Sequence, residues 1–129
     1  MSGTIGAGST MQVYVTDISA GEAWYTRLLG TPPHFVPESR VREWEIVAGN
    51  WLLVVEVEPD QTWRGGRLRL GVADIERARE ELAAALSIPV SPVDRIAGAA
   101  AWCDFDDPWG NRLGFFQDLS AAGTAGEGP

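Results

Sequence analysis

The strongest constraint on the fold of this chain is an internal repeat. The stretch VYVTDI (Val13–Ile18) resembles LGVADI (Leu70–Ile75), and GNWLLVVE (Gly49–Glu56) resembles GNRLGFFQ (Gly110–Gln117). Because both matches occur in the same order along the chain, they indicate one structural unit that occurs twice. The repeat predicts two modules, which cover residues 10–62 and 63–119. Flexible tails are predicted at residues 1–9 and 120–129.

Each module is predicted to run from a strand through a helix to strands around a Gly-Asn turn, a βαβββ unit. Apolar and polar residues alternate with the period of a half-buried strand at residues 10–16 and 67–73. Residues 41–47, 51–57, 99–105 and 112–117 are further strand candidates. The segment Asp107-Pro108-Trp109-Gly110 suits a type I turn before the last strand.

The two helices have recognisable ends. Ser19 and Glu22 form a candidate capping box, with Ile18 stapled onto Ala23, and Gly30 is a suitable end for the first helix. Asp74 is a candidate cap for the second helix. The predicted buried stripes are Ala20, Ala23, Trp24 and Leu28 in the first helix and Ile75, Ala78, Leu82 and Leu86 in the second.

The composition excludes several classes of function. All ten basic residues are arginine, so the chain has no lysine for a Schiff base or a phosphate-binding loop. His34 and Cys103 are the only histidine and cysteine, which excludes a histidine-rich or multi-cysteine metal site and an intrachain disulfide. A net charge of -8 argues against nucleic acid as a partner. Without a signal peptide or a membrane span, we expect a cytoplasmic protein with no membrane partner.

Three motifs add a family resemblance to this pattern. They are V-x-D-I at the start of the first helix, W-Y-x-R-L-L-G at its end (Trp24–Gly30), and D-P-W-G-N before the final strand (Asp107–Asn111). Across roughly residues 10 to 118 the chain resembles the vicinal oxygen chelate superfamily, which includes glyoxalase I, extradiol dioxygenases, fosfomycin-resistance enzymes and bleomycin-resistance proteins. The resemblance implies an α+β fold in which tandem βαβββ modules form a concave mixed β-sheet with helices on the outside.

The resemblance also says where a metal would be held in the metal-using families. Those positions correspond here to Thr10, Arg67, Leu53 and Gly114, none of which is an ordinary metal ligand. Glu56 lies nearby, but one carboxylate does not hold a catalytic divalent ion. The chain is therefore most similar to the metal-free, bleomycin-resistance-type members, and we expect no cofactor.

Strand alternation predicts which residues line a concave binding face. The side chains opposite the predicted core are polar, aromatic or small, and they suit a small-molecule site. The predicted ligand-binding residues are Thr10, Gln12, Tyr14, Trp51, Leu53, Arg67, Arg69, Trp102, Asp104, Arg112 and Phe116. Gly71 and Gly114 lie in the same strands, where they mark either bulges or space for a flat ligand.

Several of these residues have two interpretations. Arg67 and Arg69 either pair with acids on neighbouring strands (Glu43, Glu45 or Asp104) or bind an anionic ligand, although the net charge favours a cationic one. We interpret His34 as a surface-loop residue rather than a base, and Cys103 as a buried inert thiol. Trp24 and Trp44 are expected in the core, whereas Trp51, Trp102 and the loop residue Trp63 are candidates for ligand contact.

The favoured hypothesis is a protein that sequesters a planar or peptidic natural product in a groove, without turnover and without metal. The alternatives are a metal-independent isomerase, epimerase or lyase, in which Arg67 or Arg69 stabilises an oxyanion and Glu43, Glu45 or Asp104 acts as the base. A metal-dependent enzyme with displaced ligands and a ligand-free dimerisation module are further alternatives. In each case the resemblance implies a homodimer.

Overall fold

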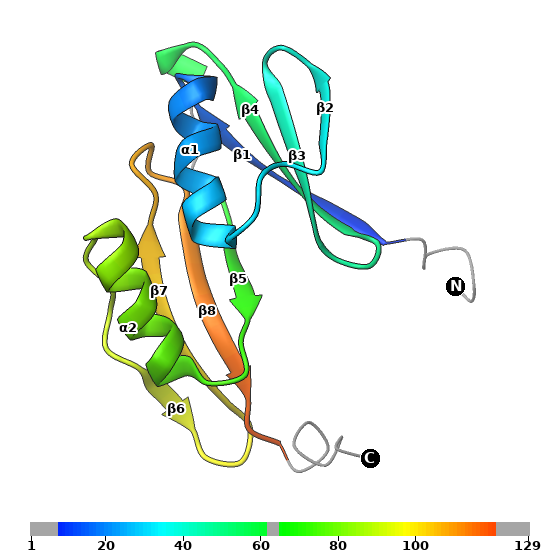
Figure 1. Cartoon of the computed structure of the whole chain (residues 1–129). Helices are drawn as coiled ribbons and strands as arrows, with labels where there is room; N and C mark the ends of the chain where they lie inside the picture. Colours follow the sequence, from blue (N-terminus) through cyan, green and yellow to red (C-terminus); the bar gives the residue numbers. More distant parts are fainter. Residues whose placement is uncertain (1–7, 62–64, 121–129) are drawn as a thin grey trace. The chain divides into compact units, whose positions relative to one another are not determined.

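The computed structural model describes residues 8–61 and 65–120, which form two compact units divided between Trp63 and Arg64 (Figure 1). The predictions for Trp63 and for most of both tails lie outside these residues. The first strand begins at Ser9, one residue before the strand predicted at residues 10–16.

Both units have the same order of elements, a strand, a helix and three strands, which confirms the predicted α+β class. The first unit contains β1 (Ser9–Val15), α1 (Ile18–Leu29), β2 (Phe35–Glu38), β3 (Val41–Val47) and β4 (Asn50–Glu56), followed by the 3-10 helix η1 (Pro59–Gln61). The second contains β5 (Arg67–Gly71), α2 (Ile75–Leu86), β6 (Asp94–Ile96), β7 (Ala100–Asp106) and β8 (Arg112–Asp118). The short strands β2 and β6 were not located from the sequence.

Each unit has its own four-stranded mixed sheet, with the order β1-β4-β3-β2 in the first and β5-β8-β7-β6 in the second. The first and last strands of each unit are parallel, and the other pairs are antiparallel. Parallel neighbours need a long connection, part of which the helix provides. Helix α1 packs on β3 and β4, and α2 packs on β7 and β8 (Figure 1). None of the described helices has the length and apolar character needed to cross a membrane.

The core of the first unit lies between α1 and the alternate residues of its strands. Trp44 is fully buried, as predicted, and so is Val54, whose side chain lies on the opposite face of the strand from the predicted groove residue Leu53. The buried face of α1 is Gly21, Trp24 and Tyr25, so the prediction that Ala20 and Ala23 lie on this face is wrong. A larger residue at position 21 would crowd the strand below, because a Cβ added to Gly21 would lie 3.0 Å from Val15 Cγ2.

The two helices begin in the same way, and not as the capping box predicted for the first one. Asp17, rather than Ser19, is the N-cap of α1, and its carboxylate accepts from Ala20 N–H at 3.1 Å. The N–H of Ile18, the first residue of the helix after this cap, donates to Glu56 Oε1 at 2.9 Å. In the second unit Asp74 caps α2 as predicted, and Ile75 N–H donates to Gln117 Oε1 at 3.0 Å. Glu56 and Gln117 are equivalent residues of the two repeats, and each accepts a hydrogen bond from the first N–H of the helix in its own unit. Glu56 therefore has a structural role.

The core of the second unit contains Ile75 and Leu82 from α2 and Phe105 and Phe115 from β7 and β8. The rings of Phe105 and Phe115 meet edge to face, with 5.1 Å between their centroids. Cys103 is fully buried among them, and this burial raises the pKa of its thiol. The prediction that the Cys103 thiol is buried is therefore confirmed.

The DPWGN motif forms the predicted turn between β7 and β8. Gly110 N–H donates to Asp107 O at 3.1 Å and closes the turn. The buried Asp107 carboxylate accepts from the backbone N–H groups of Trp109 and Asn111 and from the Asn111 amide. These contacts give the motif a structural role.

Candidate ligand-binding site in the second unit

On the face of the second sheet opposite its buried core, side chains of similar chemistry lie in rows across the strands. Strands β5, β8 and β7 lie in register, so side chains on this face form rows across the three strands. Successive rows are two residues, or about 6.7 Å, apart. We call them the charged row (Arg67, Arg112, Asp106), the ion-pair row (Arg69, Gly114, Asp104) and the aromatic row (Gly71, Phe116, Trp102).

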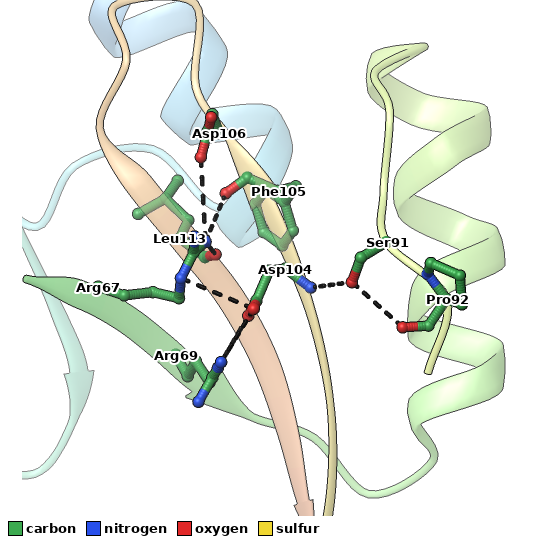
Figure 2. A network of polar contacts seen from close by, with 8 residues as sticks. All are labelled: Arg67, Arg69, Ser91, Pro92, Asp104, Phe105, Asp106 and Leu113. Carbon is green, nitrogen blue, oxygen red and sulfur yellow. Dashed lines mark hydrogen bonds and ion pairs between the residues drawn. The ribbon is translucent and has the colours of Figure 1, made fainter. Parts of the chain in front are cut away.

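The centre of this face is a two-pronged ion pair, shown in Figure 2. Arg69 Nε donates to Asp104 Oδ1 at 2.8 Å, and Arg69 Nη2 donates to Asp104 Oδ2 at 2.9 Å. Arg67 reaches across β8, where its Nε lies 3.7 Å from Asp104 Oδ2 and its Nη1 donates to the carbonyls of Phe105 and Leu113. Both arginines therefore pair with Asp104, one of the three acidic partners considered from the sequence, whereas Glu43 and Glu45 belong to the first unit.

This pairing fixes the charge on Asp104. The hydrogen bonds from Arg69 hold the pKa of Asp104 below its ordinary value despite partial burial, and the charges of Arg67 and Arg112 act in the same direction. The same hydrogen bonds raise the pKa of Arg69. Asp104 is therefore an ionised partner of the arginines at neutral pH.

The two glycines of this face provide space for side chains of the protein. A Cβ on Gly114 would lie 2.6 Å from Asp104 Oδ1, 2.7 Å from the Cys103 carbonyl oxygen and 3.0 Å from Arg69 Cγ. A Cβ on Gly71 would lie 3.0 Å from the Phe116 ring. The registers of β5–β8 and β7–β8 run without a shift, so the interpretation as bulges is wrong. The space at Gly114 is filled by the ion pair rather than left open for a ligand.

The aromatic row and Arg112 present the groups most available for contact. The Phe116 side chain is 40% exposed. Trp102 is half-buried, and Arg69 Cζ lies 5.7 Å from its ring centroid, a cation–π distance. Arg112 is exposed and has no hydrogen bond or ion pair to any residue within 8–61 or 65–120.

A pocket of about 580 Å³ adjoins the charged row. Its polar lining includes Arg67, Asp104 and Asp106, and its remaining walls are Ile88, Pro89, Ser91, Phe105, Asp107 and Pro108. Ser91 is tied to β7, because its N–H donates to Asp104 O at 2.9 Å and its Oγ accepts from Asp104 N–H at 2.8 Å (Figure 2).

The wall formed by residues 88–91 is fixed by an arginine of α2. Arg79 Nε donates to Ser91 O and Arg79 Nη2 to Val90 O, each at 2.8 Å. Arg79 therefore has a tertiary role, unlike the exposed Arg77–Glu81 pair on the same helix. No sequence signal pointed to this loop, because its contacts with β7 and α2 are tertiary.

The remaining predicted site residues lie together on the corresponding face of the first unit. Register places Thr10 beside Trp51 and Gln12 beside Leu53, and Tyr14 OH donates to Gln12 Oε1 at 3.1 Å. Sequence reasoning missed His34 as a neighbour of this face. It is exposed as predicted, but its ring meets Trp51 edge to face at 6.4 Å, and its Nδ1 accepts from Glu45 N–H at 3.0 Å.

The residues at the metal positions implied by the family resemblance do not fit a metal. In the second unit the Arg67 guanidinium lies on backbone carbonyls, and Gly114 is covered by the ion pair. Thr10 and Leu53, in the first unit, supply no carboxylate, imidazole or thiolate. Within the described part of the chain, no three His, Cys, Asp or Glu residues are grouped closely enough to hold a metal ion.

This chain consists of two βαβββ units, and in each unit the first strand pairs in parallel with the last. This is the fold of the vicinal oxygen chelate superfamily, as the sequence motifs predicted. Among similar solved structures is a glyoxalase / bleomycin resistance protein from Catenulispora acidiphila DSM 44928, with 23% identity, a TM-score of 0.72 and coverage of 87% of this chain and 98% of the other.

Two further likenesses span different roles on this fold. TnmS3, an antibiotic binding protein from Streptomyces sp. CB03234, has 20% identity and a TM-score of 0.68, with coverage of 89% of this chain and 98% of the other. The fosfomycin resistance protein FosX from Listeria monocytogenes has 16% identity and a TM-score of 0.71, with coverage of 88% and 94%. No protein-family model and no curated protein sequence matches the chain. These likenesses establish the fold, and function must be argued from the site.

Proposed function

We propose that the chain binds a small organic molecule of the natural-product or antibiotic class and releases it unchanged. The observation that carries this proposal is a pocket that adjoins the charged row of a sheet face on which Phe116 and Arg112 are exposed. A volume of about 580 Å³ lies within the range of small-molecule sites, about 300–1,000 Å³. The likeness to TnmS3, an antibiotic binding protein, supports the same class of function.

The order of the rows suggests the shape of the ligand. Phe116 and Trp102 offer ring surface for a planar group. Arg112, whose guanidinium pairs with none of the described residues, lies on the same face two rows, or about 13 Å, further along the strands. We assign ligand contacts in the second unit to Arg67, Arg69, Trp102, Asp104, Arg112 and Phe116. The first unit offers a second face of similar construction, formed by Thr10, Gln12, Tyr14, Trp51 and Leu53.

The chemistry of the second unit favours binding over turnover. A general base works best with a pKa near the working pH, but the pKa of Asp104 is lowered by Arg69. Arg69 is itself engaged by Asp104 and is not free to stabilise an oxyanion. The thiol of Cys103 is buried and its pKa is raised, so it is a poor nucleophile. The donor set supports binding without a metal.

Tryptophan fluorescence tests the proposal. A panel of planar natural products is titrated into the wild-type chain, the Trp102→Phe variant and the control Trp109→Phe. We expect saturable quenching in the wild type and the control, and weaker quenching in Trp102→Phe because its ring lies in the aromatic row. Each quenching compound is then recovered, and its mass and NMR spectrum are compared with those of the starting compound. Absence of quenching across the panel, or a change in mass or spectrum, contradicts the proposal.

A further inference from the structure

Strand β7 has one free edge position next to the pocket. Along this strand the backbone groups of successive residues point alternately to its two neighbours. Asp107 N–H donates to Asn111 O, on the β8 side, whereas Asp104 N–H and C=O both bond to Ser91 on the opposite side. The backbone N–H and C=O of Asp106 therefore point away from β8, on the side of Ser91.

The residues that precede Ser91 do not continue the backbone pairing with β7. Because the pairing is antiparallel, the residue that would face Asp106 is Pro89, two positions before Ser91, and proline has no backbone N–H to donate. Pro89 and Asp106 instead line the pocket together. Within residues 8–61 and 65–120, neither backbone group of Asp106 has a hydrogen-bond partner.

The surroundings of this edge combine polar groups with apolar walls. Arg67 lines the pocket, and its Nη2 forms no hydrogen bond with the described residues. The Asp106 carboxylate is 62% exposed and only loosely paired, with 3.9 Å between Oδ1 and Arg67 Nη1. Apolar surface comes from Ile88, Pro89, Phe105 and Pro108. A secondary amide, with its own N–H and C=O and an apolar substituent, complements the backbone groups of Asp106 and these apolar walls.

We propose that this pocket recognises a peptide-like small molecule, whose extended amide adds to the edge of β7 at Asp106. The amide N–H donates to Asp106 C=O, and its carbonyl accepts from Asp106 N–H, as in strand addition. This inference rests on the proposed binding function and names the chemical class of the ligand. Arg79 acts as a positioning residue, because it holds the opposite wall at Val90 and Ser91.

The test is an NMR titration of the full chain, labelled with ¹⁵N, with N-acetyl-L-leucine N-methylamide as the probe. We expect a saturable shift of the Asp106 amide signal. Asp106→Pro removes the N–H without removing a bond to β8, and should weaken probe binding about fivefold. The matched control Asp106→Ala keeps both backbone groups and should retain the wild-type Kd within about twofold. Equal binding by Asp106→Pro and Asp106→Ala overturns the proposal.

Hydrogen exchange of the wild type gives a second measurement that needs no variant to fold. Exchange of Asp106 N–H should be fast in the free chain and slower with saturating probe; unchanged exchange overturns the proposal. A shift of the same signal on dilution of the protein alone would assign this edge to a second copy of the chain, which also overturns it. If planar compounds quench fluorescence but the amide leaves Asp106 unaffected, the further inference fails and the binding function stands. If no planar compound binds but the amide occupies Asp106, the proposal of a planar ligand fails separately.

Discussion

Gly114 gives the most direct check of how the site face is built. In Gly114→Ala the new Cβ would lie 2.6 Å from Asp104 Oδ1 and 2.7 Å from the Cys103 carbonyl oxygen. The carboxylate can move, but the carbonyl belongs to the ladder between β7 and β8 and cannot move cheaply. Overpacking of this kind costs about 1–3 kcal/mol, partly offset by a smaller loss of unfolded-chain entropy. We expect a net loss of about 1–2 kcal/mol in the free energy of unfolding.

Urea denaturation followed by circular dichroism measures this change. The matched control is Gly66→Ala, where an added Cβ meets nothing within 4 Å, and its stability should equal or slightly exceed that of the wild type. In an Asp104→Ala background the Gly114→Ala change should cost less, because one of its two closest contacts is gone. Wild-type stability of Gly114→Ala would refute the packing of the ion pair over this glycine.

Three further outcomes are expected. Because the pKa of Asp104 is lowered in the folded chain, its contribution to stability is present above the ordinary aspartate pKa of about 3.9 and is lost as the pH falls through the lower folded value. The difference in unfolding free energy between wild type and Asp104→Asn should therefore shrink on acidification, and a constant difference would contradict the pairing. Arg79→Met should lower the unfolding free energy by about 2 kcal/mol through its two loop hydrogen bonds, while Arg77→Met, with its exposed pair, should change it by less than about 0.5 kcal/mol. We also expect light scattering to give twice the chain mass of 13.9 kDa, as a homodimer requires, and a monomer would contradict this expectation.

The fold was predictable because its signals are local and occur twice. Alternation placed Trp44 in the core correctly, since a strand with one buried face has a period of two. Gly30 and Asp74 were identified as helix ends from their residue types alone, because glycine adopts the left-handed backbone of a helix end and an aspartate carboxylate accepts from a free helix N–H. The cap of α1 was misplaced because Asp17 and Ser19 are both good caps, and a residue from another strand, Glu56, fixes the next N–H.

The site was predictable only as a set of side chains on one face. Strand parity brought Arg67, Arg69 and Asp104 to the same face, but it could not show that Gly114 makes room for their ion pair. The pocket escaped prediction because it depends on where the loop at Pro89 leaves the edge of β7. The position of this loop depends on hydrogen bonds from Arg79 to Val90 and Ser91. The charged residues around Arg79 in the sequence suggest only a solvent-exposed helix face.

Calorimetric titration of a quenching compound, with its mass and NMR spectrum measured after recovery from the complex, tests the central claim most directly. Binding without turnover in the second unit predicts saturation, an unchanged compound, and affinity about tenfold weaker in Phe116→Ala, which removes an exposed ring of the aromatic row. A chemically altered compound, or equal affinity of Phe116→Ala and wild type, would contradict it.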